Sequence, residues 1–566
     1  MEQAGFLGEL LIEQGLLTKE QLSEAREEQT RTGRLLGHIL VDFGFVEEND
    51  ILLTLGKQLG MEVVDLSTVD IPQEILKKVS SSTAKLYGVI PIRIKGNVLT
   101  VAMADPLNPN ILDDLRFTLS CDVRGAISNP EEMEAAILKF YGEEDESIED
   151  LLSEMDDELS SEISEIDSDG ITDIASLQEL ANDAPVIKLL NLILIQAIKD
   201  RASDVHFEPF EKEFKVRYRI DGALYEMVPP PKHLALAISS RIKVMADLDI
   251  AERRLPQDGR IQLNVSGRNV DLRISTLPTQ FGESVVMRVL DRTVVALDLE
   301  KLGLYKDDMD KIEELIEKPN GIIILTGPTG SGKTTTLYSA LKRINKIEDK
   351  IITTEDPIEY DLEGIMQVAI KPSIGLTFAR CLRSILRQDP DKVMVGEVRD
   401  LETAQIAIQA SLTGHLVFTT LHTNDAPGCI TRLVDMGIEP FLITSTVQAS
   451  IAQRLIRKIC EDCKEKLEVT QEMLARINLT HKDIEGRPIY HGKGCSKCNQ
   501  TGYRGRMGIF EMFLMNDALR SLVLDVAPTS VLRQKAKESG MFTLREDAVR
   551  KLLDGATTIE EVARET

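Results

Sequence analysis

Residues 327–334 constrain the fold of this chain more than any other segment, because they fit the pattern G-x-x-x-x-G-K-[ST] at every fixed position. An apolar run, residues 321–325, precedes them, and a helical segment follows. Such a strand, loop and helix belong to a parallel α/β sheet. The glycines let backbone N–H groups turn toward a phosphate, and the helix N-terminus adds partial positive charge. The sequence therefore predicts a nucleotide-phosphate site in an α/β domain.

The residues of this loop have separate expected roles. Lys333 supplies a point charge for the β- and γ-phosphates, and the hydroxyl of Thr334 is a candidate ligand for Mg²⁺. The alternative is a glycine-rich turn that binds nothing. ATP is expected to contact the loop and the first helical residues, namely Gly327, Pro328, Thr329, Gly330, Ser331, Gly332, Lys333, Thr334 and Thr335.

Acidic residues follow two further apolar strands. Glu355 and Glu359 come directly after residues 351–354, and Glu397 comes directly after residues 393–395. The carboxyl ends of parallel strands are where such sheets bind ligands, and a phosphate loop needs acids there to order Mg²⁺ and the attacking water. Either acidic cluster could instead cap a helix or form a salt bridge.

Two histidines bracket the next predicted strand, residues 416–420. His415 ends the sequence Thr-Gly-His before it, and His422 lies in Thr-Leu-His-Thr after it. A lone histidine is more often structural than functional. Two polar clusters at the ends of one strand beside a phosphate loop favour a functional role for these two.

Four of the seven cysteines form two CxxC pairs separated by 31 residues. Each pair can hold one side of a tetrahedral ion, and four thiolates leave no open position, so the pattern favours a structural zinc. The alternative is four free structural thiols. The expected ligands are Cys460, Cys463, Cys495 and Cys498.

Patterning divides the 566 residues into several parts. We expect an N-terminal helical and α+β domain over 1–141, an acidic flexible linker over 142–170 and an α+β domain over 171–293. The phosphate-loop α/β domain then covers 294–566, with the cysteine insert at about 456–510 and a helical tail. The first 58 residues contain a repeat with a period of 29, in which Gly15 aligns with Gly44 and Leu22 with Ile51.

The net charge of −27 argues against a nucleic-acid surface spread over the whole protein. Fourteen acids and no Lys or Arg lie between residues 143 and 169, which leaves −13 for the rest. No apolar run reaches the roughly 20 residues that span a bilayer, and the N-terminus lacks the basic and apolar regions of a secretory signal. We expect a cytoplasmic protein with no membrane span and no direct nucleic-acid partner.

In combination, these motifs resemble the secretion ATPases of type IV pilus assembly and type II secretion, the PilB/GspE family. Four signatures stand in order: the phosphate loop 327–334, an aspartate box 354–359, an atypical Walker B region 386–400 and a histidine box 413–423. Residues 201–206 and 217–222 of the preceding domain also match, so the resemblance is strong from about residue 183 to residue 566.

The resemblance implies a RecA-like core in a homo-hexamer, with ATP between the second and third domains. Glu397 would be the Walker B catalytic glutamate, and Glu355 and Glu359 would help position water and metal. His415 and His422 would sense nucleotide and the neighbouring subunit. Arginines of the second domain would close on the γ-phosphate, although each could instead form a salt bridge on the sheet surface; the candidates are Arg217, Arg219 and Arg273.

The expected function is a motor that hydrolyses ATP to power pilus extension through an inner-membrane platform protein, peripheral to that membrane. The family's assembly motors carry a tetracysteine insert, which the shorter retraction ATPases usually lack. A type II secretion motor is the near alternative. A nucleotide-binding scaffold without turnover and a nucleic-acid translocase are alternatives of other classes.

The N-terminal repeat resembles the tandem motif of cyclic di-GMP-binding domains attached to such ATPases. The Leu-Gly pairs, the glycine turns and the terminal Gln29 and Gln58 match. The motif usually opens with Arg, where this chain has Phe6 and Leu35, and Arg34 lies one residue early. The repeat is therefore either a cyclic di-GMP site or a helical bundle that docks onto a membrane-side partner.

Overall fold

The chain divides into two compact units, Met1–Val294 and Val295–Thr566, in the computed structural model. The expected acidic linker falls almost wholly outside the described residues, as do Phe6, Arg34 and Leu35 of the repeat. The structure describes residues 184–265, 268–291, 297–484 and 486–566; residues 60–142 without 68, 70, 105–110, 113–114, 117–118 and 120; and, before these, 8, 10–12, 14–32, 36, 39–40, 43–46, 50–51, 54 and 56.

The two halves of the N-terminal repeat share one apolar core. Leu11 and Leu40, which occupy equivalent positions 29 residues apart, are both buried in it. The equivalent pairs Leu17 and Val46, and Leu22 and Ile51, join them. Gly15 and Gly44 both take positive φ values, 74° and 67°, as the predicted turns require. The helix α2 (Lys19–Thr32) belongs to the first half.

A small mixed sheet follows the repeat, in the strand order β1-β4-β3-β2. Pro91 lies in β2, at the sheet edge, where a residue without an N–H donor is tolerated. Helices cover the sheet. The elements are β1 (Glu62–Val63), α5 (Gln73–Leu76), α6 (Ser81–Tyr87), β2 (Val89–Lys95), β3 (Val98–Met103), β4 (Asp122–Ile127) and α8 (Pro130–Tyr141).

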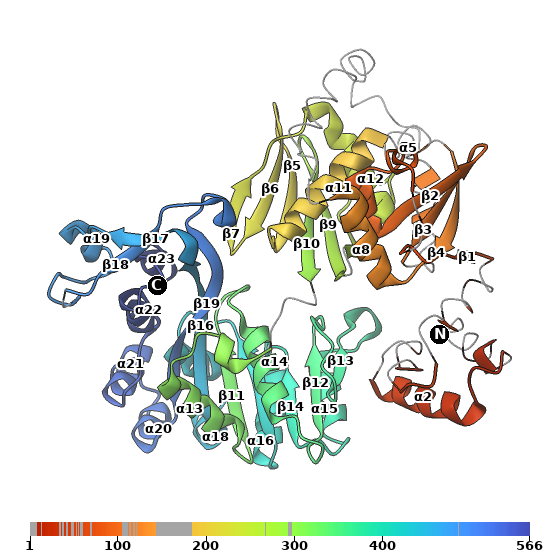
Figure 1. The fold of residues 1–566 in the computed structure, drawn as a ribbon. Helices are drawn as coiled ribbons and strands as arrows, with labels where there is room; N and C mark the ends of the chain where they lie inside the picture. The colour runs from red at the N-terminus through yellow and green to blue at the C-terminus, as the bar shows by residue number, and fades with distance from the viewer. Residues whose placement is uncertain are drawn as a thin grey trace. The chain divides into compact units, whose positions relative to one another are not determined.

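The rest of the first unit is an antiparallel sheet in the order β7-β6-β5-β10-β9-β8, with helices against one face (Figure 1). Alternate residues such as Val205, Tyr218 and Leu272 are buried on that face together with apolar residues of α11 and α12. The elements are α11 (Ala184–Lys199), β5 (Asp204–Pro209), β6 (Phe214–Ile220), β7 (Ala223–Glu226), η1 (Lys232–Leu234), α12 (Ala235–Met245), β8 (Gln257–Val265), β9 (Arg268–Thr279) and β10 (Gly282–Asp291).

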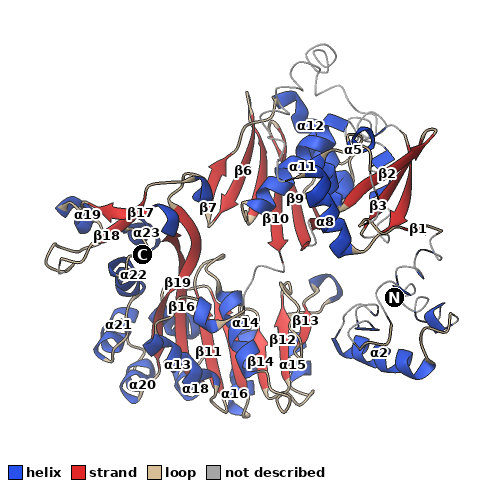
Figure 2. Cartoon of the chain, in the orientation of Figure 1, coloured by secondary structure: helices blue, strands red, loops and turns tan. Residues whose placement is uncertain are grey.

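The second unit contains a seven-stranded sheet in the order β13-β12-β14-β15-β11-β16-β19. Helices lie on both faces (Figure 2), so its central strands are apolar at consecutive positions. Ile322 and Ile324 of β11 face one core, and Ile323 and Leu325 face the other. The strands are β11 (Gly321–Thr326), β12 (Ile351–Glu355), β13 (Met366–Ala369), β14 (Lys392–Val395), β15 (Leu416–Leu421), β16 (Val447–Ile459) and β19 (Tyr503–Leu514).

Helices and a small insert complete the second unit. The insert carries a two-stranded sheet, β17 (Lys464–Leu467) and β18 (Ile489–Gly492), with α19 (Gln471–Ala475), η4 (Glu461–Cys463) and η5 (Ser496–Cys498). The remaining helices are η2 (Leu299–Lys301), α13 (Lys306–Ile316), α14 (Lys333–Ile344), η3 (Pro372–Ile374), α15 (Phe378–Ile385), α16 (Leu401–Leu412), α17 (Ala426–Asp435), α18 (Pro440–Thr446), α20 (Asp517–Leu524), α21 (Thr529–Glu538), α22 (Leu544–Leu553) and α23 (Ile559–Glu565).

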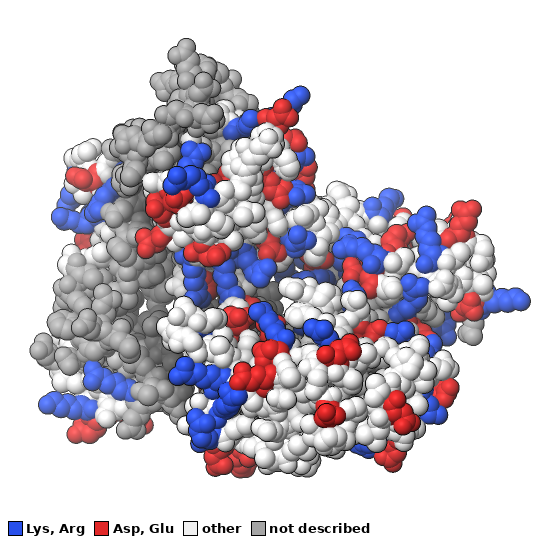
Figure 3. Space-filling view, turned by 180° about the vertical axis from the view of Figure 1, so that it is seen from behind, with Lys and Arg blue, Asp and Glu red and all other residues white. Residues whose placement is uncertain are grey.

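Acidic and basic side chains are interspersed on the face seen in Figure 3. Within the described part of the chain, no helix has both the length and the apolar character needed to cross a membrane.

Candidate nucleotide site

The phosphate loop joins β11 to α14, as the sequence predicted. Gly332 stands at the N-cap of α14 in a left-handed conformation, φ 87°, and no side chain caps the helix. The first N–H groups of a helix have no partner within it, so this uncapped end can bind an anion. A Cβ on Gly327 would lie 2.5 Å from the carbonyl oxygen of Gln453, and one on Gly332 would lie 2.9 Å from its Nε2. Only glycine fits at either position.

Lys333 folds back over this loop. Its Nζ donates to the carbonyl oxygens of Gly327 and Pro328, at 2.8 and 2.9 Å. Burial lowers the pKa of Lys333, and the carboxylate of Glu397 opposes that shift. Thr334, the next residue, is exposed at the start of the helix. A cradle of glycines, a lysine and an exposed hydroxyl at a helix start fits a nucleotide phosphate with its Mg²⁺.

Glu397 lies at the carboxyl end of β14 and is only 12% exposed. Its Oε1 is 2.5 Å from Nη2 of Arg399, and its Oε2 is 3.5 Å from Nε2 of His422. Backbone contacts of the preceding residue, Gly396, hold Glu397 in this position. The N–H of Gly396 donates to Thr354 O at 2.8 Å, and the carbonyl of Gly396 accepts from Thr420 Oγ1 at 2.7 Å. The ends of β12, β14 and β15 thus meet around one carboxylate.

Glu355 is buried in a hydrogen-bond network rather than in an open site. Tyr338 Oη of α14 donates to its Oε2, and its Oε1 accepts from Thr353 Oγ1 at 2.5 Å and from Gln367 Nε2 at 3.1 Å. Tyr338 Oη also accepts from the backbone N–H of Glu359 at 3.3 Å. Glu355, through its side chain, and Glu359, through its backbone N–H, are therefore tied to the helix that follows the phosphate loop. Their expected action on water and metal stays a prediction.

The two histidines lie at opposite edges of the sheet. His422 follows β15 at the same edge as the phosphate loop, because Leu421 pairs with Thr326 in the register of β15 and β11. His415 precedes β15 at the other edge, where its Nδ1 lies 2.8 Å from Ala410 O. Of these two histidines, His422 reaches the site, and a role of His415 toward a neighbouring subunit stays a prediction.

The candidate arginines lie on the open face of the antiparallel sheet of the first unit. Residues paired directly across strands point to the same face, and one such row crosses five strands. The sequence analysis proposed Arg219 and Arg273 from this row, but it missed the two further arginines because register is not readable from one strand. The row is Arg260, Arg273, Arg288, Asp204 and Arg219.

Carboxylates hold several of these arginines. Arg219 Nε and Arg288 Nε lie 3.6 and 3.2 Å from the two oxygens of Asp204. Arg217, two residues from Arg219, donates from Nη2 to Glu208 Oε1 at 2.7 Å. Arg288 is nevertheless 54% exposed, so this face presents positive charge that an incoming phosphate can meet.

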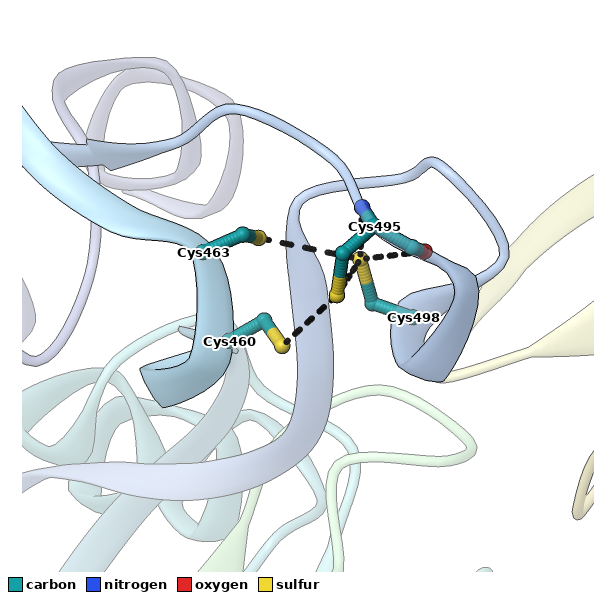
Figure 4. Close-up of side chains that lie close together, drawn as sticks. All are labelled: Cys460, Cys463, Cys495 and Cys498. Carbon is teal, nitrogen blue, oxygen red and sulfur yellow. Dashed lines mark hydrogen bonds between the residues drawn. The ribbon is translucent and has the colours of Figure 1, made fainter.

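The four cysteines of the insert converge on one point (Figure 4). Neighbouring Sγ atoms lie 3.6, 3.8 and 3.9 Å apart, and all four lie within 4.8 Å of one another. Four thiolates at about 2.3 Å from a tetrahedral zinc have sulfurs roughly 3.8 Å apart. The N–H groups of Cys495 and Gly502 donate to Cys498 Sγ at 3.2 and 3.3 Å, which stabilises a thiolate. Both the donor set and the geometry fit zinc.

Comparison with known proteins agrees with this site. The family model described as "Type II/IV secretion system protein" matches residues 179–564. The chain is 46% identical over 565 residues to the type IV pilus assembly ATPase PilB of Myxococcus xanthus, covering 100% of this chain and 99% of that one. The chain belongs to this family of secretion ATPases. The expected resemblance and the expected enzyme class are thereby confirmed.

Other relatives of the family serve a different system. The chain is 45% identical over 562 residues to the type II secretion system protein E of Xanthomonas campestris, covering 99% of this chain and 98% of that one. The X-ray structure of the Legionella pneumophila ATPase DotB matches with a TM-score of 0.50 at 20% identity, over 66% of this chain and 94% of that one, which shows the RecA-like fold.

An MshEN domain model matches residues 59–147, after the tandem repeat.

Proposed function

We propose that this chain powers the assembly, or extension, of a type IV pilus. It acts as a cytoplasmic homo-hexamer, peripheral to the inner membrane, and pushes on a platform protein of that membrane. The observation that carries the proposal is the placement of Lys333, Glu397 and His422 at the carboxyl ends of β11, β14 and β15. The end-to-end match to a pilus assembly ATPase supports the choice of system.

The residues of the site divide the chemistry among them. The loop N–H groups and Lys333 bind the phosphates of ATP, and the Thr334 hydroxyl holds Mg²⁺, which neutralises phosphate charge. Glu397 accepts the proton of the attacking water, and Arg399 and His422 hold its two oxygens in place. The arginine row contributes charge stabilisation for the γ-phosphate through Arg219 and Arg273. The cysteine cluster binds a structural zinc.

Function in the source organism tests the choice of system. A strain carrying Lys333→Ala should lose surface pili and twitching movement while exported enzymes remain in the medium at wild-type levels. Loss of exported enzymes with pili intact would contradict the proposal and assign the chain to secretion.

A type II secretion motor is the second candidate, and the full-length match to protein E of Xanthomonas campestris favours it. The same strain therefore decides between the two systems. A pull-down of the full chain from membranes adds an independent measurement, because the platform proteins of the two machines differ in sequence.

A further inference from the structure

One row of the seven-stranded sheet links the nucleotide site to the C-terminal helices. In the register of β15, β11, β16 and β19, Leu421 pairs with Thr326, Thr326 with Ala452, and Ala452 with Glu511. The phosphate loop begins directly after Thr326, and His422 directly after Leu421. Glu511 therefore lies in the row on which both functional segments begin.

Glu511 holds the first turns of two helices. It is 3% exposed; its Oε1 accepts from Ala426 N at 2.9 Å, and its Oε2 accepts from Leu544 N at 3.3 Å. These two residues open α17 and α22, where backbone N–H groups have no partner inside the helix. Burial raises the pKa of Glu511, and the two N–H donors act in the opposite direction. One buried carboxylate thus fixes where both helices begin.

Asp425 makes a second link at the start of α17. Its Oδ1 accepts from Gly428 N at 2.7 Å as the N-cap, while its Oδ2 pairs with Nη2 of Arg533 on α21. The two side chains are 27% and 40% exposed, so the pair is accessible to water. Thr431 and Thr529 join the same two helices through their hydroxyls at 2.7 Å.

A four-residue turn, from His422 to Asp425, connects these links to the proposed catalytic carboxylate. Thr423 N donates to Thr326 Oγ1 at 2.9 Å, and Thr423 Oγ1 donates to Asp425 O at 3.0 Å. His422, the residue before Thr423, reaches Glu397 at 3.5 Å. The turn from His422 to Asp425 is therefore held on one side by the phosphate-loop strand and on the other by α21 and β19.

We propose that Asp425, Arg533 and Glu511 are positioning residues for ATP hydrolysis, a role that rests on the proposed chemistry at Glu397. They fix the turn from His422 to Asp425 so that the imidazole meets the carboxylate. Turnover consequently depends on where α21 and α22 lie relative to the sheet. The C-terminal helices are then a control element of the nucleotide site and not only a cover for it.

Variants of the ion pair test the role without removing the helix cap. Asp425→Asn keeps a side-chain oxygen for Gly428 N but loses the charge that pairs with Arg533. Arg533→Met removes the other partner. Lys535→Met is the control, because Lys535 lies on the same helix, is 41% exposed and pairs with Glu538 three residues further along that helix. We expect each of the first two changes to lower kcat by roughly fivefold or more, with KM for ATP and the melting temperature near wild type.

Two further variants separate positioning from general stability. Arg533→Lys restores the ion pair and should recover most of kcat. In a His422→Ala background, Arg533→Met should cause no further loss, because the residue acts through that histidine. An unchanged kcat for Arg533→Met, or the same loss with and without His422, would overturn the proposal. Failure of the underlying chemistry has a different signature, namely wild-type turnover by Glu397→Gln.

Discussion

His422 Nε2 lies 3.5 Å from Glu397 Oε2, although the two residues follow different strands of the sheet. The contact arises because β14 and β15 are parallel neighbours, so their carboxyl ends meet at one edge. A nucleotide-dependent movement of either strand end would change the distance between the imidazole of His422 and the carboxylate of Glu397. Substitutions at this edge should therefore affect turnover more than ATP binding.

Glu397→Gln should bind ATP and not hydrolyse it. The amide keeps the size of the side chain but cannot accept a proton from water, so phosphate release should fall by about a hundredfold or more. Binding of a fluorescent ATP analogue, measured alongside, should be unchanged.

The matched control is Glu402→Gln, the same chemical change on an exposed carboxylate of α16 that pairs with Arg383. It should release phosphate at the wild-type rate. Lys333→Ala is the complementary variant, because loss of the ammonium should abolish tight binding itself. Equal turnover by the wild type and Glu397→Gln would remove Glu397 from its proposed role.

Arg219→Ala and Arg273→Ala should each lower turnover by roughly two orders of magnitude or more, because arginines that meet a γ-phosphate act mainly in the transition state. Lys212→Ala, an exposed residue in the turn between β5 and β6, is the control. Phosphate release is measured at a protein concentration where sedimentation shows intact rings. Activity that survives both changes would leave these arginines as salt bridges of the sheet.

Turnover per subunit should rise with protein concentration until rings form, because a hexameric site is assembled by mass action. Phosphate release and sedimentation velocity are followed over the same dilution series, and the two midpoints should coincide. A monomer with constant activity throughout the series is the contrary result.

Metal analysis of protein purified without chelators should find about one zinc per chain, because four thiolates form a closed tetrahedral site. Cys460→Ser should release that zinc and loosen the insert, since metal binding supplies folding free energy there. Cys429→Ser, at a buried thiol outside the cluster, is the control and should keep the metal. Metal-free wild-type protein with an intact insert would refute the assignment.

Titration of the full chain with cyclic di-GMP decides between the two interpretations of the repeat. Heat of binding and a raised melting temperature would identify a nucleotide site. No response at high micromolar ligand would leave the docking bundle. The departure of the first motif position from Arg to Phe6 and Leu35 makes the docking role our expected outcome.

Two features of the second unit were predictable because their signals lie in short stretches of sequence. The central strands are apolar at consecutive positions because both faces of the sheet are covered, and the phosphate loop has a fixed spacing of glycines and lysine. The strand β8 has a weaker local signal, because its start contains Asp258 and Gly259, two residue types that are depleted in strands. Glycine avoids crowding at this position, since a Cβ there would lie 3.0 Å from Ala246 O at the end of α12.

Contacts between segments that are distant in the chain could not be predicted from the sequence. The enclosure of Glu355 by Tyr338 and Gln367 depends on how α14 and β13 pack on β12. Arg399 was visible only as part of a motif, and its contact with Glu397 requires the backbone path after β14. The positions of Arg260, Arg288 and Glu511 depend on strand register, because a shift of one residue would move each side chain to the opposite face of the sheet.

β16 passes the phosphate loop and the cysteine cluster in turn. Gln453 forms a wall of the loop, and the strand ends at Ile459, directly before Cys460, the first of the four clustered cysteines. The proposed zinc would clamp the far end of this strand, so the wall of the nucleotide loop would be anchored from outside the sheet. The stretch between the two cysteine pairs is itself part of the packed unit, because Leu474 and Ile477 are buried in the same apolar cluster as Ile559 of α23. Its exposed turn, which includes His481 and Lys482, can change sequence or acquire a binding partner while the geometry of ATP binding is preserved.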